Sequence, residues 1–223
     1  MVKIGLTGGI GSGKTTVSQI FRERGIPVFN SDLCARELEN DQQIKDGYKA
    51  ILGEDIYVDG VLNRDKLRAI IFTDKDKLKQ INKLVTPHIK TKFEKFCKDN
   101  ADHQIVMLES AILFETNTQD NFDYIVTVTA SENTRMTRVI KRDNAKLEDV
   151  LNKLANQLPE SDKISKSHFI IINEGHDLID SLEILSKQVD TIHKALKYDI
   201  VAKAASDLAD TLNDTTKDLG NHG

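Results

Sequence analysis

The feature that most constrains this chain is the run GGIGSGKT at residues 8–15, which fits the pattern G-x-x-x-x-G-K-[ST] in full. Backbone N–H groups can wrap a triphosphate only where side chains leave room, and the four glycines of this run leave it. In such loops the lysine, here Lys14, reaches the β- and γ-phosphates, and the hydroxyl of Thr15 ligates Mg²⁺. A glycine turn that only links a strand to a helix is the competing interpretation. The sequence favours a nucleoside-triphosphate site with Mg²⁺, formed by Gly11, Ser12, Gly13, Lys14, Thr15 and Thr16.

The segments around this loop predict an α/β fold. Short apolar runs predict five strands, at residues 3–7, 26–29, 103–108, 124–128 and 169–172. Helical periodicity marks residues 14–24, 133–143, 147–158 and 180–198. Because strands and helices alternate along the chain, we expect a mainly parallel five-stranded sheet flanked by helices.

Residues 33–98 are mainly helical and predict an insertion between the second and third strands. Its breaks are expected near Asn40 and Asp41, at Gly53, at Asp59-Gly60 and at Pro87. The Asp-Gly pair within residues 57–62 is a weak hairpin signal. Residues 200–212 keep an apolar spacing of four that extends or repeats the last helix, and the polar residues 213–223 are expected to be frayed.

Two carboxylates stand where predicted strands end. Asp32 follows the second strand, and ligands of open α/β sheets bind beyond the carboxyl ends of strands. It is therefore a candidate base for a substrate hydroxyl, or else the N-cap of a helix that begins near Leu33. Glu109 ends the third strand, where an acid suits a magnesium partner or, again, a cap.

A basic ridge formed by Arg135, Arg138, Lys141 and Arg142 follows the fourth strand. Arg138 and Arg142 are four residues apart and share one face of the predicted helix. The ridge is either a solvated helix face or part of a lid that closes on phosphates. Its position favours the lid, in which arginine stabilises the charge that develops on the transferred group.

Composition excludes several classes of protein. The chain of 223 residues has a net charge of −4, which argues against a sequence-independent nucleic-acid binder. It contains no apolar run of the roughly 18 residues that a membrane span requires. Its two cysteines, Cys34 and Cys97, predict reduced thiols in a cytoplasmic protein, and its six histidines lack metal-binding spacing.

Several motifs together resemble the dephospho-CoA kinases. Residues 5–17 (GLTGGIGSGKTTV) resemble the opening of that family, and Asp32 matches the second acid of its Asp-x-Asp motif. Residues 59–64 (DGVLNR) resemble D-G-x-L-[DN]-R, and residues 111–115 (AILFE) resemble P-L-L-F-E. Arg138, Arg142 and Gln157 have the spacing of the family's lid residues, and residues 173–175 (NEG) resemble N-x-G. The resemblance covers about residues 1–196.

The chain also departs from the family pattern. Asn30 replaces the first acid of Asp-x-Asp, and Ala111 replaces a proline. Thr86 precedes Pro87 where the family has histidine, and residues 167–168 are Ser-His instead of Ala-Asp. The phosphate loop, Asp32 and the two lid arginines are retained, which indicates a divergent but active member.

The resemblance implies a P-loop kinase fold in several parts. The nucleotide-binding core would comprise residues 1–32, 100–132 and 165–198, the helical acceptor-binding domain 33–99, the lid 133–164 and a C-terminal extension 199–223. It also implies that a monomeric enzyme transfers the γ-phosphate of ATP to the ribose 3′-hydroxyl of dephospho-CoA, without nucleic-acid or membrane partners. By this resemblance, the catalytic residues are Asp32, Lys14 and Arg142, and the lid residues that bind ATP are Arg138 and Arg142. The acceptor would be bound by Asp32, Arg64 and Glu109. Mg²⁺ would be bound by Thr15 and Glu109.

Three other functions compete with this interpretation. Another small-molecule or nucleotide kinase would share the loop and lid and differ in residues 33–98. A GTP-dependent switch would need an N-K-x-D motif, and the Asn-Lys pairs at residues 82 and 152 lack its aspartate. A nucleotide-binding adaptor without catalysis is disfavoured because Lys14, Thr15 and Asp32 are all present.

Overall fold

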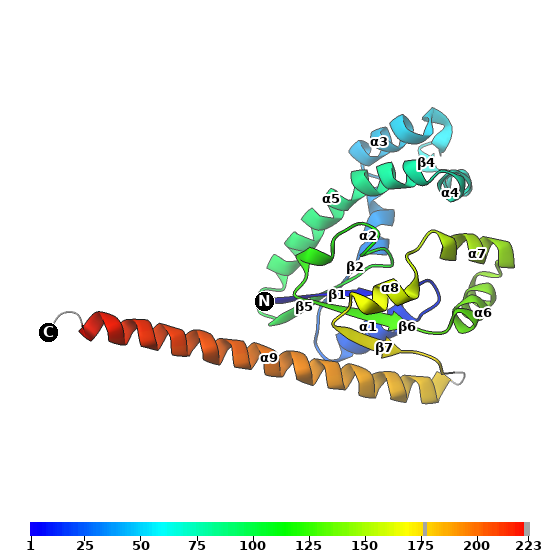
Figure 1. The fold of residues 1–223 in the computed structure, drawn as a ribbon. Helices are drawn as coiled ribbons and strands as arrows, with labels where there is room; N and C mark the ends of the chain where they lie inside the picture. The colour runs from blue at the N-terminus through cyan, green and yellow to red at the C-terminus, as the bar shows by residue number, and fades with distance from the viewer. Residues whose placement is uncertain (176–177, 221–223) are drawn as a thin grey trace.

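The computed structural model describes residues 1–175 and 178–220, and a five-stranded sheet lies at its centre (Figure 1). The strands follow the order β2-β5-β1-β6-β7, and each neighbouring pair is parallel. Their bounds are β1 Val2–Thr7, β2 Val28–Asn30, β5 Ile105–Glu109, β6 Tyr124–Thr129 and β7 Phe169–Ile172. The predicted parallel sheet is confirmed, and every predicted strand end lies within two residues of the observed one.

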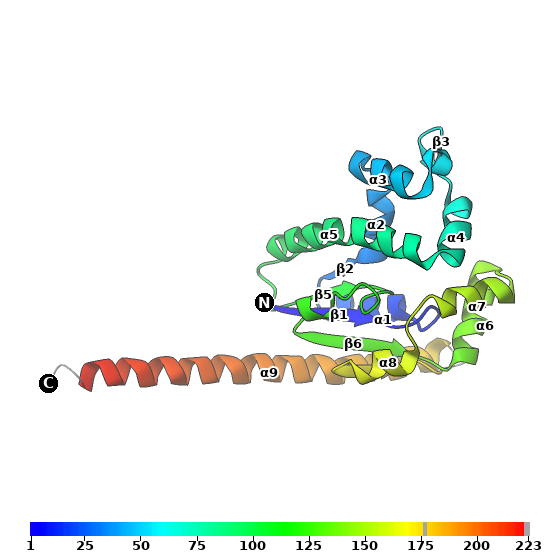
Figure 2. The same cartoon turned by 45° about the horizontal axis from the view of Figure 1, so that its top comes forward.

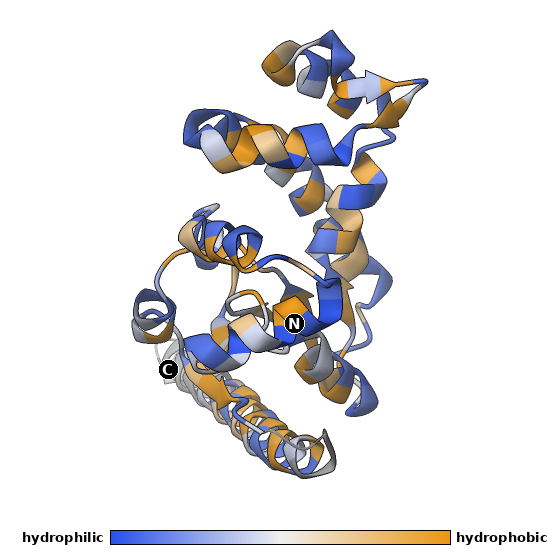
Figure 3. Ribbon diagram, turned by 90° about the vertical axis from the view of Figure 1, so that its right-hand side faces the viewer, coloured by the Kyte–Doolittle hydropathy of each residue, from blue (hydrophilic) through white to orange (hydrophobic). Residues whose placement is uncertain are grey.

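Helices cover both faces of this sheet, because its strands are apolar on both sides. On one face, α1 (Lys14–Glu23) and α9 (Leu178–Gly220) bury side chains such as Phe21 and Val189 against the strands. On the other face, α5 (Lys75–Asp99) packs Phe93 against Val106 and Leu108. In Figure 3 hydrophobic and hydrophilic residues alternate along the helices, as expected for helices with one buried side.

The insertion between β2 and β5 has a hydrophobic core of its own, which includes Ile44, Ile56 and Val85. Its elements are α2 Ser31–Leu38, α3 Gln42–Leu52, η1 Glu54–Ile56, β3 Tyr57–Val58, β4 Val61–Leu62, α4 Arg64–Thr73 and α5. The Asp-Gly signal is confirmed as a hairpin, in which Asp59 and Gly60 have φ angles of 50° and 79°.

The break predicted at Pro87 is wrong, because α5 runs through this residue without interruption. Proline removes one helical hydrogen bond, yet Val85 before it and Phe93 after it are both buried on the same helix. Packing along the whole helix therefore outweighs the local cost. The break lies instead at Asp74, whose Oδ1 accepts the backbone N–H groups of Asp76 and Lys77 and so caps α5.

Three helices follow β6, of which the first two lie near the carboxyl ends of the strands, below α4 in the view of Figure 2, and the third lies beside β6. They are α6 Glu132–Asp143, α7 Leu147–Ala155 and α8 Glu160–Ser165. The first two were predicted. The short α8, which begins after Pro159, was not, because six residues are too few to show a helical period.

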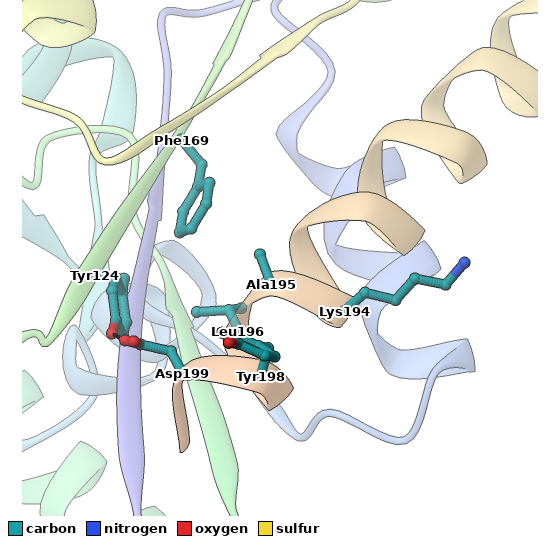
Figure 4. Close-up of a pocket in the computed structure, with 7 residues that line it drawn as sticks. All are labelled: Tyr124, Phe169, Lys194, Ala195, Leu196, Tyr198 and Asp199. Atoms are coloured by element: carbon teal, nitrogen blue, oxygen red, sulfur yellow. Dashed lines mark hydrogen bonds between the residues drawn. The ribbon is translucent and has the colours of Figure 1, made fainter. Parts of the chain in front are cut away.

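The last helix is longer than predicted. Helix α9 continues through Gly220, past the sheet, where frayed chain was expected from residue 213, and residues 221–223 lie outside the described residues (Figure 1). Tyr124 and Phe169, the first residues of β6 and β7, line a hollow beside α9 (Figure 4). Because the sheet is parallel, this hollow lies at the end of the sheet opposite the phosphate loop. Over the described residues, no helix is long and apolar enough to span a membrane.

Candidate active site

The phosphate loop leads from β1 directly into α1, as the sequence predicts. Gly13 is the N-cap of α1 and has a φ angle of 92°, in the left-handed region that glycine alone adopts readily. A Cβ atom at Gly8 would lie 2.1 Å from the carbonyl oxygen of Val128. The loop therefore requires glycine at both positions. Its N–H groups stand at the N-terminus of α1, where the helix dipole favours an anion.

Lys14 lies folded against the loop that it belongs to. Its Nζ donates a 2.8 Å hydrogen bond to the carbonyl oxygen of Gly8, and a longer one of 3.5 Å to that of Gly9. Burial lowers the pKa of Lys14, while the charge of Asp32 opposes that shift. A triphosphate bound in the loop would supply the negative charge that this buried ammonium group lacks.

Glu109 connects the loop to β2. The side chain is only 2% exposed, its Oε1 accepts a 3.2 Å hydrogen bond from Thr15 Oγ1, and its Oε2 accepts one of 3.2 Å from Asn30 Nδ2. A hydroxyl and a carboxylate oxygen at this separation are ligand types that suit Mg²⁺ when phosphates and water complete its shell. The described residues contain no cluster of three or more His, Cys, Asp and Glu suited to a metal ion. A magnesium ion here would depend on these two side chains and the nucleotide.

Asp32 does not cap α2. That helix begins at Ser31, two residues before the expected start, and its N-cap is Asn30, whose Oδ1 accepts the Leu33 N–H at 2.8 Å. The carboxylate of Asp32 is left free to accept the backbone N–H of Ala111, on the segment that follows β5. Desolvation raises the pKa of Asp32, the charge of Lys14 lowers it and Glu109 raises it. The charge of Asp32 therefore interacts with both Lys14 and Glu109 at the phosphate-loop site.

A cavity of about 310 Å³ opens beside Asp32. Helices α2, α3 and α5 form one wall, with Tyr48, Val85 and Phe93, and the segment after β5 forms the other. Most of the lining is apolar, and Asp32 is its one carboxylate. The arrangement places an acidic group between a phosphate loop and a mainly apolar cavity, which is the geometry that transfer of a phosphoryl group to a bound hydroxyl requires.

Comparison with known proteins identifies the family. The sequence model of the dephospho-CoA kinase family matches residues 2–178. The chain belongs to the dephospho-CoA kinase family. A dephospho-CoA kinase of Bacteroides fragilis is 32% identical over 195 residues, which cover 86% of this chain and 95% of that protein. One of Listeria monocytogenes is 35% identical over 199 residues, which cover 86% and 95%.

Solved structures agree on the architecture. A Thermus thermophilus protein superposes with a TM-score of 0.73 at 29% identity, over 85% of this chain and 96% of that one. A dephospho-CoA kinase from Campylobacter jejuni superposes with a TM-score of 0.61 at 20% identity, over 86% and 98%, which supports the fold. The P-loop kinase fold expected of the dephospho-CoA kinase family is therefore present.

Asn30 shows how this chain accommodates a departure from the family motif. Its Oδ1 caps α2 while its Nδ2 holds Glu109. An aspartate here could cap the helix equally well, but it would place a second carboxylate against Glu109 without a donor. The amide of Asn30 instead donates a hydrogen bond that orients Glu109.

Replacement of Asn30 by alanine is expected to lower the free energy of unfolding by about 1 kcal/mol, the usual value of an N-cap. Chemical denaturation measures the change, and Asn30→Ser, which restores a capping oxygen, is the matched control. An alanine variant as stable as wild type would mean that the α2 cap contributes nothing.

The lid arginines are not on the phosphate loop in this structure. Arg138 donates to the carbonyl oxygens of Asn173 and Gly175, both at 3.0 Å, and Arg142 pairs with its neighbour Asp143 at 2.7 Å. Arg135 lies on the loop instead. Its guanidinium is so close to Gly9 that a Cβ there would meet it at 2.3 Å. Of the predicted basic ridge, Arg135 in the first turn of α6 thus contacts the loop, whereas Arg138 and Arg142 bond to other residues in this structure.

Two further side chains bond to the backbone of the loop, and a buried ion pair lies on neighbouring segments. Gln157 Oε1 accepts the N–H of Ile10 at 2.8 Å, and Asn173 Nδ2 donates to the carbonyl oxygen of Ser12 at 2.8 Å. Fully buried Lys163 pairs with Glu115 at 2.8 Å. The family motifs pointed to Gln157 and Asn173, whereas no local pattern pointed to Lys163 or to the special place of Arg135.

Arg64 lies away from the cavity beside Asp32. It donates to Glu39 Oε2 at 2.7 Å, and about half of its side chain is exposed. A role for Arg64 in acceptor binding would therefore require movement of the insertion, and it stays a prediction.

Proposed function

We propose that this chain transfers the γ-phosphate of ATP to the ribose 3′-hydroxyl of dephospho-CoA, yielding CoA and ADP. Membership of the dephospho-CoA kinase family supports the acceptor. The observation that carries the proposal is the position of Asp32, released from capping by Asn30 and placed at a mainly apolar cavity within electrostatic reach of Lys14.

In this proposal the loop residues Gly11, Ser12, Gly13, Lys14, Thr15 and Thr16 bind the ATP phosphates. Lys14 leaves its carbonyl partners and approaches the γ-phosphate. Thr15 and Glu109 would hold Mg²⁺, which would neutralise negative charge on the phosphates. Glu109 also borders the acceptor site.

Asp32 accepts the proton of the 3′-hydroxyl and keeps its oxygen aligned with the γ-phosphorus. Arg138 and Arg142 approach the phosphates when the lid closes, and Arg142 stabilises the charge that develops on the transferred group.

We also infer the functional division of the chain. Residues 1–32, 100–132 and 165–198 form the nucleotide-binding core, 33–99 the acceptor-binding domain, 133–164 the lid and 199–223 an extension. The separate hydrophobic core of the insertion supports the second of these parts. We propose a cytoplasmic monomer, and the free, buried thiols of Cys34 and Cys97 suit a reducing compartment.

The direct test is ATP consumption by the purified protein with Mg²⁺, in the presence and absence of dephospho-CoA. Other hydroxyl acceptors, such as nucleosides and shikimate, serve as controls. ADP release that requires dephospho-CoA supports the proposal. Phosphorylation of another acceptor while dephospho-CoA stays unchanged would overturn it.

Closure of the lid is expected to slow hydrogen exchange across residues 133–158 when a non-hydrolysable ATP analogue and the acceptor bind together. Arg138 and Arg142 must leave their present partners to reach the phosphates, and phosphate contacts then order this segment. Exchange–mass spectrometry measures the effect, with strand β5 as the internal reference. Equal exchange in the free and bound protein would indicate that these arginines form only a solvated helix face.

A further inference from the structure

A second hollow, of about 620 Å³, adjoins the cavity beside Asp32. One wall is formed by α4 and the first turns of α5, and the other by α7 and the segment after β5 (Figures 1 and 2). The two hollows share the lining residues Asn82 and Ile112. Ile112 follows Ala111, whose N–H bonds to Asp32. The second hollow therefore begins next to the proposed site of phosphoryl transfer.

The lining of this second hollow is basic. Its lysines come from three parts of the chain and are Lys75, Lys79, Lys153 and Lys166. The one acid in the lining, Glu115, is already paired with buried Lys163 at 2.8 Å. Two of the lysines form long ion pairs with acids outside the lining: the Nζ atoms of Lys79 and Lys153 lie 3.7 Å from carboxylate oxygens of Asp76 and Asp143, respectively. We call this basic hollow the lysine groove.

Two of its lysines stand where a helix disfavours them. Lys75 is the first residue of α5 and Lys79 follows one turn later, on the same face. Cations near a helix N-terminus oppose the helix dipole. Because Asp74 already caps this end of α5, the positive charge of the two lysines is what would attract an anion into the groove. The amide groups of Asn82, Asn117 and Asn156 add hydrogen-bonding capacity to the lining.

We propose that the lysine groove binds the 5′-diphosphate of dephospho-CoA, while its adenine occupies the mainly apolar cavity. The assignment rests on the proposed function. In dephospho-CoA the ribose that carries the 3′-hydroxyl also carries the diphosphate, so a hydroxyl at Asp32 requires a diphosphate site nearby. The lysine groove is the basic hollow that adjoins that position.

The volume of the apolar cavity also supports placing the adenine there and the diphosphate in the lysine groove. Pockets of roughly 300–1,000 Å³ hold ligands of drug size, and a cavity of about 310 Å³ is at the small end of that range. Dephospho-CoA is larger than an ordinary drug and needs room beyond this cavity. Past the lysines, the groove is lined by Ile71, Phe72 and Leu78, which suit the less polar pantetheine arm.

The lysines of the groove also relate binding of the diphosphate to closure of the lid. Lys75 and Lys79 belong to the insertion, whereas Lys153 belongs to α7. Like charges on the two sides repel each other until an anion lies between them. A bound diphosphate therefore removes the repulsion that keeps the two sides apart.

The test compares two acceptors that share adenine and ribose, dephospho-CoA and adenosine, of which only dephospho-CoA carries the diphosphate and the pantetheine arm. Radiolabelled ATP detects slow turnover of the smaller acceptor. The double variant Lys75→Gln/Lys79→Gln is expected to lower kcat/KM for dephospho-CoA by about tenfold or more, since each charge-assisted hydrogen bond is worth about that factor. The same variant should change kcat/KM for adenosine, and KM for ATP, by less than about twofold.

Lys83→Gln is the matched control, because Lys83 is exposed on the same helix and does not line the groove. Lys75→Arg/Lys79→Arg keeps the charge and should retain most of the activity. Equal losses with both acceptors, or a loss no larger than that of Lys83→Gln, would overturn the groove assignment. Wild-type protein that does not act on dephospho-CoA would overturn the proposed function, and the groove assignment with it.

Discussion

Replacing Lys14 by alanine should lower kcat by on the order of 10²–10³-fold, the usual cost of removing a donor aimed at transition-state charge. Within the phosphate loop, Lys14 is the one side chain that carries positive charge. Its ammonium group is buried and lies over the carbonyl oxygens of Gly8 and Gly9, so it is already close to the position of the phosphates. Steady-state kinetics at saturating ATP and dephospho-CoA measures the effect.

The variant also removes two hydrogen bonds from the free loop, so its fold must be checked separately. Circular dichroism and chemical denaturation should show a folded protein, because the glycine conformations that shape the loop do not depend on the lysine. Lys98→Ala, which removes an exposed lysine in the last turn of α5, is the matched control and should leave kcat unchanged. A folded Lys14→Ala protein with kcat within a factor of about 3 of wild type would contradict the assigned role.

The parts of this structure that the sequence predicts well are those that local chemistry decides. The phosphate loop needs positive φ angles and open backbone, and only glycines supply both at Gly8 and Gly13. The central strands β1, β5 and β6 are buried on both faces, so each appears as a short apolar run. The Asp-Gly pair specifies its hairpin without help from the rest of the chain.

The sequence is a poorer guide where packing between distant segments decides. Pro87 should end a helix, but buried side chains on either side of it keep α5 continuous. Arg135, Arg138 and Arg142 recur at helical spacing, and only the docking of α6 on the loop determines that Arg135 is the one in contact. Nothing near Lys163 indicates that its partner, Glu115, lies almost fifty residues away in the sequence.

The ambiguity at Asp32 shows how much can depend on one helix boundary. Both Asn30 and Asp32 are suitable N-cap residues, and the sequence placed the start of the helix near Leu33. The helix begins at Ser31 instead, so Asn30 caps it and Asp32 falls within its first turn. A shift of two residues thus turns a capping aspartate into a candidate base.

Asp32→Asn is therefore expected to lower kcat by roughly 10²-fold, the contribution of a positioned base, while stability and ATP binding stay near wild type. Asparagine keeps the size of the side chain and can still accept the N–H of Ala111, but it cannot take a proton from the acceptor. Because Asn30 provides the cap, the substitution leaves the start of α2 intact. Asp46→Asn, on the exposed surface of α3, is the matched control.

The pH profile gives a second, independent measure of the same residue. A base must be deprotonated to act, so kcat/KM should fall as the pH drops through the pKa of Asp32. Desolvation raises that pKa, and the acidic limb should therefore lie above the range of an ordinary aspartate. In Asp32→Asn this limb should disappear, because the remaining group no longer titrates.

A loose transition state needs less help from a base, so a smaller loss of kcat would assign Asp32 mainly to alignment of the hydroxyl. Wild-type turnover in Asp32→Asn would instead move the search for the base to Glu109, the other carboxylate within reach of the loop.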